Sequence, residues 1–180
     1  MGFLTNKVAM ITGAGRKKGL GAGIARRFAE EGAQVIITDI GTSTKNLLPS
    51  EHIGTLDEMK QVAELISSET NQRVDSVVCD VTSEESVCGA IDKIITSYQK
   101  IDIVVNNAGV GFIMKPLVDL TIEEWDIVLN VNLRGAFLVT KHVSKRFIEQ
   151  ANGGRIINIA SQAAKSPAQF LAHYTSSKHG

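Results

Sequence analysis

Two side chains near the end of the sequence have the types and the spacing that proton transfer requires. Tyr174 and Lys178 are four residues apart, so on a helix they lie on the same face. A free phenol has a pKa near 10, which makes it a poor base at neutral pH. An ammonium at about 4 Å, with an effective dielectric near 20, favours the phenolate by roughly 4 kcal/mol. Such a pair could deliver a proton to an alkoxide or take one from an alcohol.

Two further polar residues occupy positions where a polar side chain suggests a functional role. Ser161 follows an apolar strand candidate, so it would lie at the carboxyl edge of a sheet, where open α/β folds bind ligands. Asn132 falls in the middle of a helix candidate, which is unfavourable unless its side chain or a local backbone distortion has a role. Taken singly, each has an ordinary explanation as a turn residue or an exposed helix position. Their joint occurrence with the tyrosine and the lysine favours a site.

A glycine-rich loop lies at the other end of the sequence, in the segment TGAGRKKGLGAG that starts at Thr12. A strand candidate precedes it and a helical pattern follows. Glycines there permit a tight turn, close approach of the backbone to a pyrophosphate and close packing of helix on strand. The helix N-terminus then offers free N–H groups to phosphates. The residues of this loop predicted to bind a dinucleotide are Gly13, Gly15, Gly19, Leu20 and Gly21. A P-loop is excluded, because no Gly-Lys-Ser/Thr closes the loop.

The choice between the two nicotinamide dinucleotides depends on charge. Asp39 ends the second strand candidate, where a carboxylate can accept hydrogen bonds from the adenosine ribose. The same carboxylate would repel a 2′-phosphate, which favours NAD. Lys17 and Lys18 favour NADP, but loop lysines are mobile and screened. We therefore predict NAD as the cofactor, ahead of NADP.

The elements that must position these residues alternate between short β-branched runs and longer helical patterns. This order predicts an α/β fold, a Rossmann-like doubly wound parallel sheet with helices on both faces and strand order 3-2-1-4-5. The expected strands are Val8–Thr12, Val35–Thr38, Val74–Cys79, Ile101–Val105 and Arg155–Ile159. The expected helices are Ala22–Glu31, Asp57–Glu69, Ser83–Tyr98 and Ile122–Gln150, with another beginning near His173. Thr82 with Glu85, and Thr121 with Glu124, have capping-box spacing. The polar stretch 40–56 is interpreted as a surface insertion.

Composition narrows the class of protein further. The 180 residues carry 19 basic and 19 acidic side chains, and 43% are hydrophobic, which fits one globular domain over 1–180 and excludes disorder. A balanced charge argues against nucleic acid or an anionic membrane as partner. Only two cysteines, with no histidine at ligand spacing, predict a reducing, cytoplasmic location and no metal site.

Six motifs in order make the sequence resemble the short-chain dehydrogenase/reductase family in its compact form. They are the glycine loop, Cys79-Asp80-Val81, Asn106-Asn107-Ala108-Gly109, Asn132 with its neighbours Val131-Asn132-Leu133-Arg134-Gly135, Ser161, and the Tyr174 to Lys178 segment. Each motif alone is modest, but together they span nearly the whole chain.

The resemblance implies roles for these residues. Tyr174 would be the acid/base, and Lys178 would favour its phenolate and hold the nicotinamide ribose. Ser161 would orient the substrate oxygen, and Asn132 would hold a water in a proton relay. The adenosine-ribose side of the cleft would be lined by Asn107, Ala108 and Gly109, and the adenine by Asp80 and Val81. Family members commonly pair through their long helices, so a homodimer or homotetramer is expected.

Two features depart from the family pattern. Five residues separate Gly13 and Gly19, where the family usually has three, so the loop is two residues longer. Family members also continue beyond the Tyr/Lys helix with further strands and a segment that covers the substrate, whereas this sequence stops at Gly180. We therefore expect these residues to be the N-terminal part of a longer polypeptide.

The sequence thus predicts an NAD-dependent oxidoreductase that interconverts a secondary alcohol and its ketone. Polyols, hydroxysteroids, small diols and 3-oxoacyl thioesters remain open as substrates. A competing hypothesis is a binding module without turnover, a redox sensor or scaffold; the joint presence of Ser161, Tyr174 and Lys178 argues against it. Epimerisation or dehydration of a nucleotide sugar is a third hypothesis, which the Asn-Asn-Ala-Gly sequence disfavours.

Overall fold

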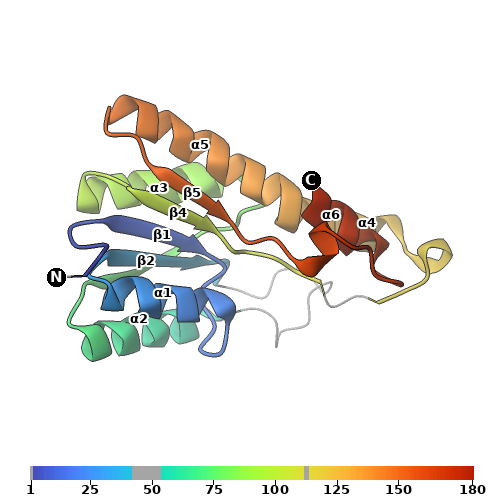
Figure 1. Cartoon of the computed structure of the whole chain (residues 1–180), viewed down its shortest axis with the longest axis horizontal. Coiled ribbons are helices and arrows are strands. Elements are labelled where there is room, and N and C mark those ends of the chain that lie inside the picture. Colours follow the sequence, from blue (N-terminus) through green and yellow to red (C-terminus); the bar gives the residue numbers. More distant parts are fainter. Residues whose placement is uncertain (1, 42–53, 112–113) are drawn as a thin grey trace.

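A five-stranded parallel sheet forms the centre of the molecule (Figure 1). The computed structural model describes residues 2–41, 54–111 and 114–180. The strand order is β3-β2-β1-β4-β5, so the predicted doubly wound topology is confirmed. The crossover direction reverses between β1 and β4, which is where folds of this kind bind ligands. The strands are β1 (Val8–Thr12), β2 (Gln34–Asp39), β3 (Val74–Val78), β4 (Ile103–Asn106) and β5 (Arg155–Asn158).

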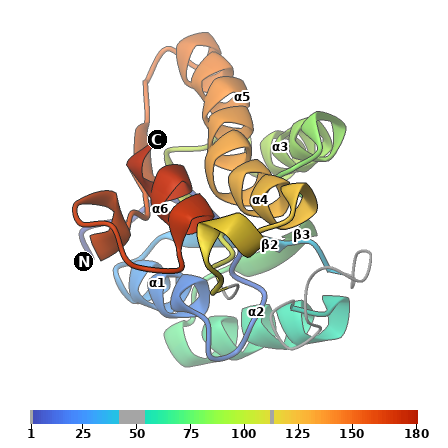
Figure 2. The same ribbon diagram turned by 90° about the vertical axis from the view of Figure 1, so that its right-hand side faces the viewer.

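Helices cover both faces of this sheet. The helices are α1 (Leu20–Glu30), α2 (Leu56–Thr70), α3 (Glu84–Tyr98), α4 (Ile122–Leu129), α5 (Gly135–Glu149) and α6 (Ala172–His179). Helices α1 and α2 pack on one face, and α3 and α5 pack on the other. Helices α4 and α6 contact each other beyond the carboxyl ends of the strands, as Figures 1 and 2 show. No helix in the described ranges has both the length and the apolar character to cross a membrane.

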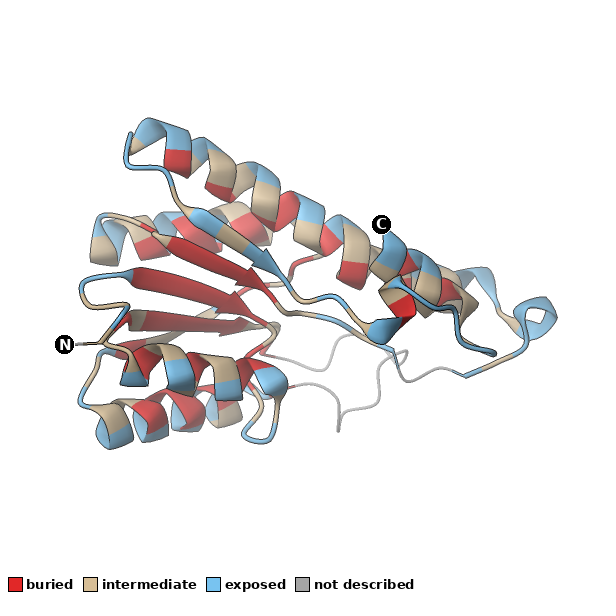
Figure 3. Ribbon diagram, in the orientation of Figure 1, coloured by how far each residue is buried: buried red, intermediate tan, exposed pale blue. Residues whose placement is uncertain are grey.

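Burial follows from this layering (Figure 3). Every residue of β1 and β4 is buried, because neighbouring strands and helices enclose them. One apolar cluster joins α1 and α2 to the sheet, and a second joins α3 and α5. Strand β5 lies at the edge of the sheet, and most of its residues are exposed. The rigid centre therefore holds the carboxyl ends of β1, β2 and β4 in fixed positions.

The predicted capping box at Thr82 is wrong. The residue that caps α3 is Ser83, whose hydroxyl accepts a hydrogen bond from the Ser86 amide. The Thr82 hydroxyl instead donates to the Asp80 carboxylate at 2.7 Å. Because serine and threonine cap helices almost equally well, the spacing to Glu85 could not decide between adjacent residues.

The single helix predicted over 122–150 is interrupted. It begins as expected, since Thr121 and Glu124 form a complete capping box. The segment Asn130–Arg134, here called the π-turn, then separates α4 from α5 with the wider π-helical hydrogen bonding. The π-turn contains Asn132, the residue whose mid-helix position suggested a local backbone distortion.

The predicted insertion over 40–56 lies mostly outside the described residues, since 42–53 are not among them. Its far end is described. Gly54 is buried against the glycine loop, and a Cβ there would lie 2.8 Å from the carbonyl carbon of Gly15. The end of this stretch therefore packs on the loop predicted to hold phosphates.

Candidate active site

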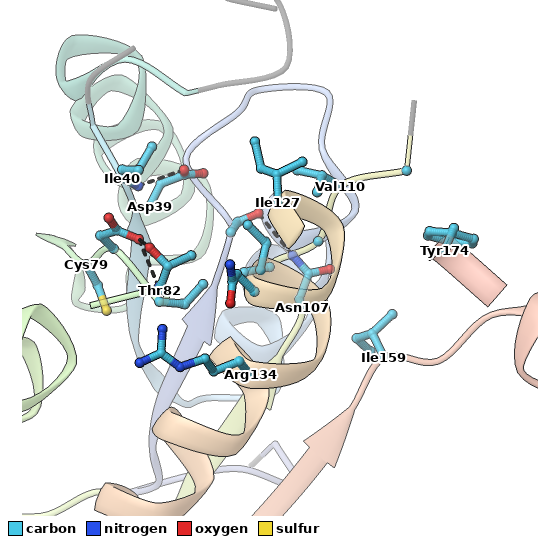
Figure 4. A pocket seen from close by; sticks show the side chains of 18 of the residues that line it. Asp39, Ile40, Cys79, Thr82, Asn107, Val110, Ile127, Arg134, Ile159 and Tyr174 are labelled. Atoms are coloured by element: carbon cyan, nitrogen blue, oxygen red, sulfur yellow. Dashed lines mark hydrogen bonds between the residues drawn. The ribbon is translucent and has the colours of Figure 1, made fainter. Parts of the chain in front are cut away.

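A cleft of about 1010 Å³ opens at the carboxyl ends of the strands (Figure 4). Its wall is formed by the end of β2, the glycine loop, the loops that follow β3, β4 and β5, and the helical segments α4, the π-turn and α6. Most of the residues predicted from the sequence line it. They are Gly13, Gly19, Leu20, Asp39, Asp80, Val81, Asn107, Ala108, Gly109, Tyr174 and Lys178. The other four, Gly15, Gly21, Asn132 and Ser161, lie behind or beside the wall.

The glycine loop is held close to the start of the loop after β4. Gly13 has a φ of +64°, and a Cβ there would lie 2.6 Å from the Cα of Ala108. The Asn107 amide group donates to the Thr12 and Gly13 carbonyls, at 2.8 and 3.0 Å. A Cβ on Gly21 would lie 2.7 Å from the same amide nitrogen. The two loops therefore form one backbone cradle, and side chains at these glycines would fill it.

Asp39 lies at the end of β2 with both carboxylate oxygens bound to backbone. Its Oδ2 accepts from the Gly15 amide at 2.9 Å, and its Oδ1 accepts from the Ile40 amide at 2.8 Å. Burial raises the pKa of Asp39, while these two amides and the charge of Arg16 act in the opposite direction. Each carboxylate oxygen has a second lone pair available for a ribose hydroxyl.

Two arginines line the cleft that the sequence did not single out. Arg16, in the glycine loop, faces the cleft, whereas the exposed Lys17 and Lys18 are absent from its lining. The Lys17 amide donates to the Glu58 side chain at 2.9 Å, which ties this part of the loop to α2. Arg134 reaches toward the cleft from the π-turn, as Figure 4 shows. Beside the glycine loop, the positive charge in the cleft therefore comes from Arg16 and not from the two lysines.

Tyr174 is at the other end of the cleft, as Figure 4 shows. Lys178 follows it on α6 and also lines the cleft. The lysine Nζ lies 5.9 Å from the centroid of the tyrosine ring and donates to the Ile159 carbonyl at 2.8 Å. Burial lowers the pKa of Lys178. A Cβ on Gly111 would lie 2.6 Å from Cε2 of Tyr174, so the ring packs flush against that backbone. The two side chains are thus neighbours in the cleft, with the amine nitrogen 5.9 Å from the ring centroid and not at the 4 Å used for the prediction.

Asn132 clamps α6 to the loop after β4. Its Oδ1 accepts from the Val110 amide at 2.8 Å, and its Nδ2 donates to the Val110 carbonyl at 2.9 Å. The same Nδ2 donates to the Ser177 hydroxyl at 2.9 Å, one residue before Lys178. Both amide protons are used, so the side chain acts here as a positioning group. No sequence spacing indicates these three partners.

We expect Asn132→Ala to destabilise the full-length protein. The change leaves the Val110 backbone groups and the Ser177 hydroxyl without their partner, which costs about 1–3 kcal/mol. Urea unfolding would measure the loss. Asn130→Ala is the matched control, because that side chain makes no hydrogen bond among the described residues, and its effect should stay within about 0.5 kcal/mol. Equal unfolding midpoints for the two variants would contradict the clamp.

Ser161 and His173 lie next to the cleft without lining it. The Ser161 hydroxyl accepts from the Ala163 amide at 3.2 Å, which leaves its proton free for a ligand oxygen. His173 is fully buried, and its two ring nitrogens have no partner within the described parts of the chain. Burial also lowers the pKa of His173. The structure thus brings Tyr174, Lys178 and the cradle into one cleft and leaves Ser161 at its border.

Comparisons with known proteins identify the family to which the chain belongs. The family model described as short chain dehydrogenase matches residues 7–180. The chain is 35% identical over 177 residues to D-threitol dehydrogenase of Mycolicibacterium smegmatis, which covers 98% of this chain and 61% of that enzyme. It is 37% identical over 180 residues to galactitol 2-dehydrogenase of Agrobacterium fabrum, and the match covers 97% of this chain and 60% of that enzyme. A solved structure of carveol dehydrogenase from Mycobacterium avium in complex with NAD is similar at a TM-score of 0.90 and 29% identity, covering 100% of this chain and 63% of that one. The chain spans about three fifths of the length of these relatives.

Proposed function

Because the chain belongs to the short-chain dehydrogenase family, we propose that the full-length protein is a nicotinamide-dependent oxidoreductase that interconverts a secondary alcohol and its ketone. One observation carries the proposal: a single cleft has a glycine cradle and Asp39 at one end, and Tyr174 with Lys178 at the other. The relatives support it, because they are named as dehydrogenases of D-threitol and galactitol.

The residues of the cleft fit a dinucleotide. Gly13 has no Cβ, so the cradle is not filled at that position. Helix α1 begins directly after Gly19, and its first N–H groups are available to phosphates. Asp39 would accept hydrogen bonds from the adenosine ribose, and Asp80 with Val81 would border the adenine. Asn107, Ala108 and Gly109 would line the ribose side. The bound nicotinamide would supply the hydride acceptor in oxidation and the donor in reduction.

In this proposal Tyr174 takes the hydroxyl proton of the alcohol or returns it to the ketone oxygen. The Nζ of Lys178 lies 5.9 Å from the centroid of the Tyr174 ring, so the amine would be close to the reacting hydroxyl group. The Ile159 carbonyl fixes the ammonium at 2.8 Å, and Asn132 fixes the helix that carries both residues. Ser161 would donate its remaining proton to the substrate oxygen, an oxyanion-type role. Polarisation of the substrate C–O bond and transfer of the hydroxyl proton thus depend on side chains that the fold orients before the substrate binds.

We propose NAD as the preferred cofactor. The Asp39 carboxylate is anchored by two backbone amides, so it cannot easily turn away from a 2′-phosphate. Arg16 lies in the lining and could attract that phosphate, whereas Lys17 and Lys18 do not line the cleft. The charge nearest the predicted ribose position is therefore negative. A solved structure of a similar protein, NAD⁺-bound xylitol dehydrogenase at 34% identity, supports a nicotinamide dinucleotide as the cofactor.

The test uses the full-length protein with a panel of polyols, small diols, hydroxysteroids and 3-hydroxyacyl thioesters, following the absorbance of the reduced nicotinamide. We expect turnover with NAD to exceed turnover with NADP. Asp39→Ala should lower the NAD/NADP ratio of kcat/KM by about 10- to 100-fold, since a hydrogen bond to a charged group contributes about 1.5–3 kcal/mol. Tight binding of the dinucleotide with no turnover of any substrate would favour a non-catalytic sensor. An unchanged ratio would overturn the role of Asp39.

The substrate class, the cellular location and the oligomeric state are predictions that follow from the same reasoning. Two of the relatives are named for polyols, D-threitol and galactitol, which supports a polyol as one of the substrate classes to test. A cytoplasmic location and a homodimer or homotetramer stay predictions, which cell fractionation and native mass measurement of the full-length protein would test.

A further inference from the structure

A second cluster of reactive side chains lies between α3 and α5, outside the lining of the cleft. The Cys88 sulfur is 3.4 Å from Nδ1 of His142 and 3.7 Å from its Nε2. The Nε2 of His142 is 2.7 Å from Oε1 of Glu84, which also accepts from Lys141 at 2.7 Å. Glu84 and Cys88 are four residues apart on α3, so both face α5.

The hydrogen bonds assign the protons within this cluster. Hydrogen bonds from Lys141 and His142 lower the pKa of the Glu84 carboxyl, so at neutral pH it is ionised and can only accept. Nε2 of His142 must then carry the proton of the bond to Glu84. In the neutral imidazole the other nitrogen, Nδ1, carries no proton, and it is the ring nitrogen nearer to the Cys88 sulfur.

Proton transfer is the chemistry that this arrangement permits. Among the described residues, no group of three His, Cys, Asp or Glu side chains is arranged to hold a metal ion. The 2.7 Å bond from His142 to Glu84 leaves no room for one between them. Both cysteines are free of disulfides, and Cys88 is half-buried whereas Cys79 is buried.

We propose that Cys88 is a peroxide-reactive thiol, with His142 as the base that accepts its proton and Glu84 as the group that orients His142. The thiol proton passes to Nδ1, and the sulfur attacks one oxygen of hydrogen peroxide. The O–O bond breaks, and the leaving hydroxide takes the proton from Nδ1 to form water. Sulfur is oxidised by two electrons to a sulfenic acid, and the peroxide is reduced by two electrons. The proposal is independent of the proposed dehydrogenase activity.

The molecule contains its own reference thiol. Cys79 is buried, and burial raises its pKa to about 12, so it should stay unmodified. We would treat the full-length protein with hydrogen peroxide, trap sulfenic acid with dimedone and locate the adduct by peptide mass spectrometry. We expect the adduct on Cys88, its loss in Cys88→Ser and its retention in Cys79→Ser. An adduct on Cys79 alone, or none at all, would overturn the proposal.

The role of the base is tested through pH. The charged groups around the thiol are Glu84 of α3 and Lys141 and His142 of α5, with the Asp92–Arg146 ion pair further along the same two helices. At pH 6 the alkylation of Cys88 by iodoacetamide should be about tenfold slower in His142→Gln, because thiolate then forms only at higher pH. The rate of this variant should also reach its plateau at a higher pH than that of the wild type.

Two glutamate variants distinguish the orientation of His142 by Glu84 from a general effect of negative charge near the thiol. Glu84→Gln should shift the pH profile of alkylation in the same direction as His142→Gln. Glu85→Gln removes one negative charge from the adjacent exposed position and should leave the profile unchanged. Thermal unfolding of each variant would confirm that it folds. Superimposable profiles for the wild type and His142→Gln would show that His142 does not act on the thiol, and would overturn the proposal.

Discussion

Replacing Tyr174 with phenylalanine in the full-length protein should lower kcat by about 10²- to 10⁴-fold, the usual contribution of a general acid/base. The ring keeps its packing against Gly111, and only the hydroxyl is lost. The dissociation constant for the dinucleotide should therefore stay within about threefold of the wild type, because in the proposed binding mode its phosphates and adenosine would contact the far end of the cleft. Steady-state kinetics and a fluorescence titration would measure the two quantities.

Tyr98→Phe is the matched control, since the chain has only two tyrosines. Its hydroxyl donates to Asp75 at 2.6 Å, and the residue does not line the cleft. This variant should keep the kcat of the wild type. Substantial activity in Tyr174→Phe, within about threefold of the wild type, would show that another group moves the proton.

Gly13→Ala should disrupt both folding and dinucleotide binding. The backbone at Gly13 has a φ of +64°, and holding a residue with a side chain in that region costs about 1–3 kcal/mol. The new Cβ would also lie 2.6 Å from the Cα of Ala108, and overpacking of this kind costs a further 1–3 kcal/mol or so. The loop after β4 must move, so the cradle would no longer match a pyrophosphate. Urea unfolding and dinucleotide titration of the full-length protein would measure both effects.

The same loop region offers a control for this change. Gly23 lies on the exposed side of α1, and a Cβ there meets no atom within 4 Å. Gly23→Ala should leave dinucleotide binding unchanged and stabilise the protein by about 0.5–1 kcal/mol, because alanine favours a helix interior. If Gly13→Ala bound the dinucleotide as well as Gly23→Ala, the close approach of the two loops would not matter for binding.

The sequence predicted the sheet well because buried parallel strands have a strong signature. Strand β1 has the predicted bounds, and β4 begins two residues later than expected, at Ile103. The continuous apolar runs also predicted helices on both faces, which the structure confirms. Local hydrogen bonding was less predictable. Ser83 caps α3 because the Thr82 hydroxyl is already bound to Asp80, a local choice that the spacing to Glu85 does not contain. The π-turn within 122–150 contains Asn132, whose partners Val110 and Ser177 lie in distant segments that residue spacing does not specify.

The site shows the same division. Spacing and strand ends were sufficient to bring Asp39, Tyr174 and Lys178 to one cleft, and the family resemblance is confirmed. Spacing could not decide which side chains of the glycine loop face the cleft. From the sequence, the positive charge of the loop is therefore assigned to Lys17 and Lys18, whereas Arg16 is the residue that lines the cleft. Spacing also could not show that the Asn132 side chain forms hydrogen bonds with Val110 and Ser177, because these contacts require the folded π-turn. The catalytic and cofactor-binding roles themselves stay predictions.

The cleft described above draws its walls from both halves of the sheet, so it exists only in the folded chain. A ligand that binds only this form at 100 times its dissociation constant adds about 2.7 kcal/mol to the free energy of unfolding. Intracellular proteases that degrade chains through transient unfolding respond to that difference. If the cleft holds a dinucleotide, the lifetime of the protein in a cell depends on the supply of that nucleotide as well as on its own sequence.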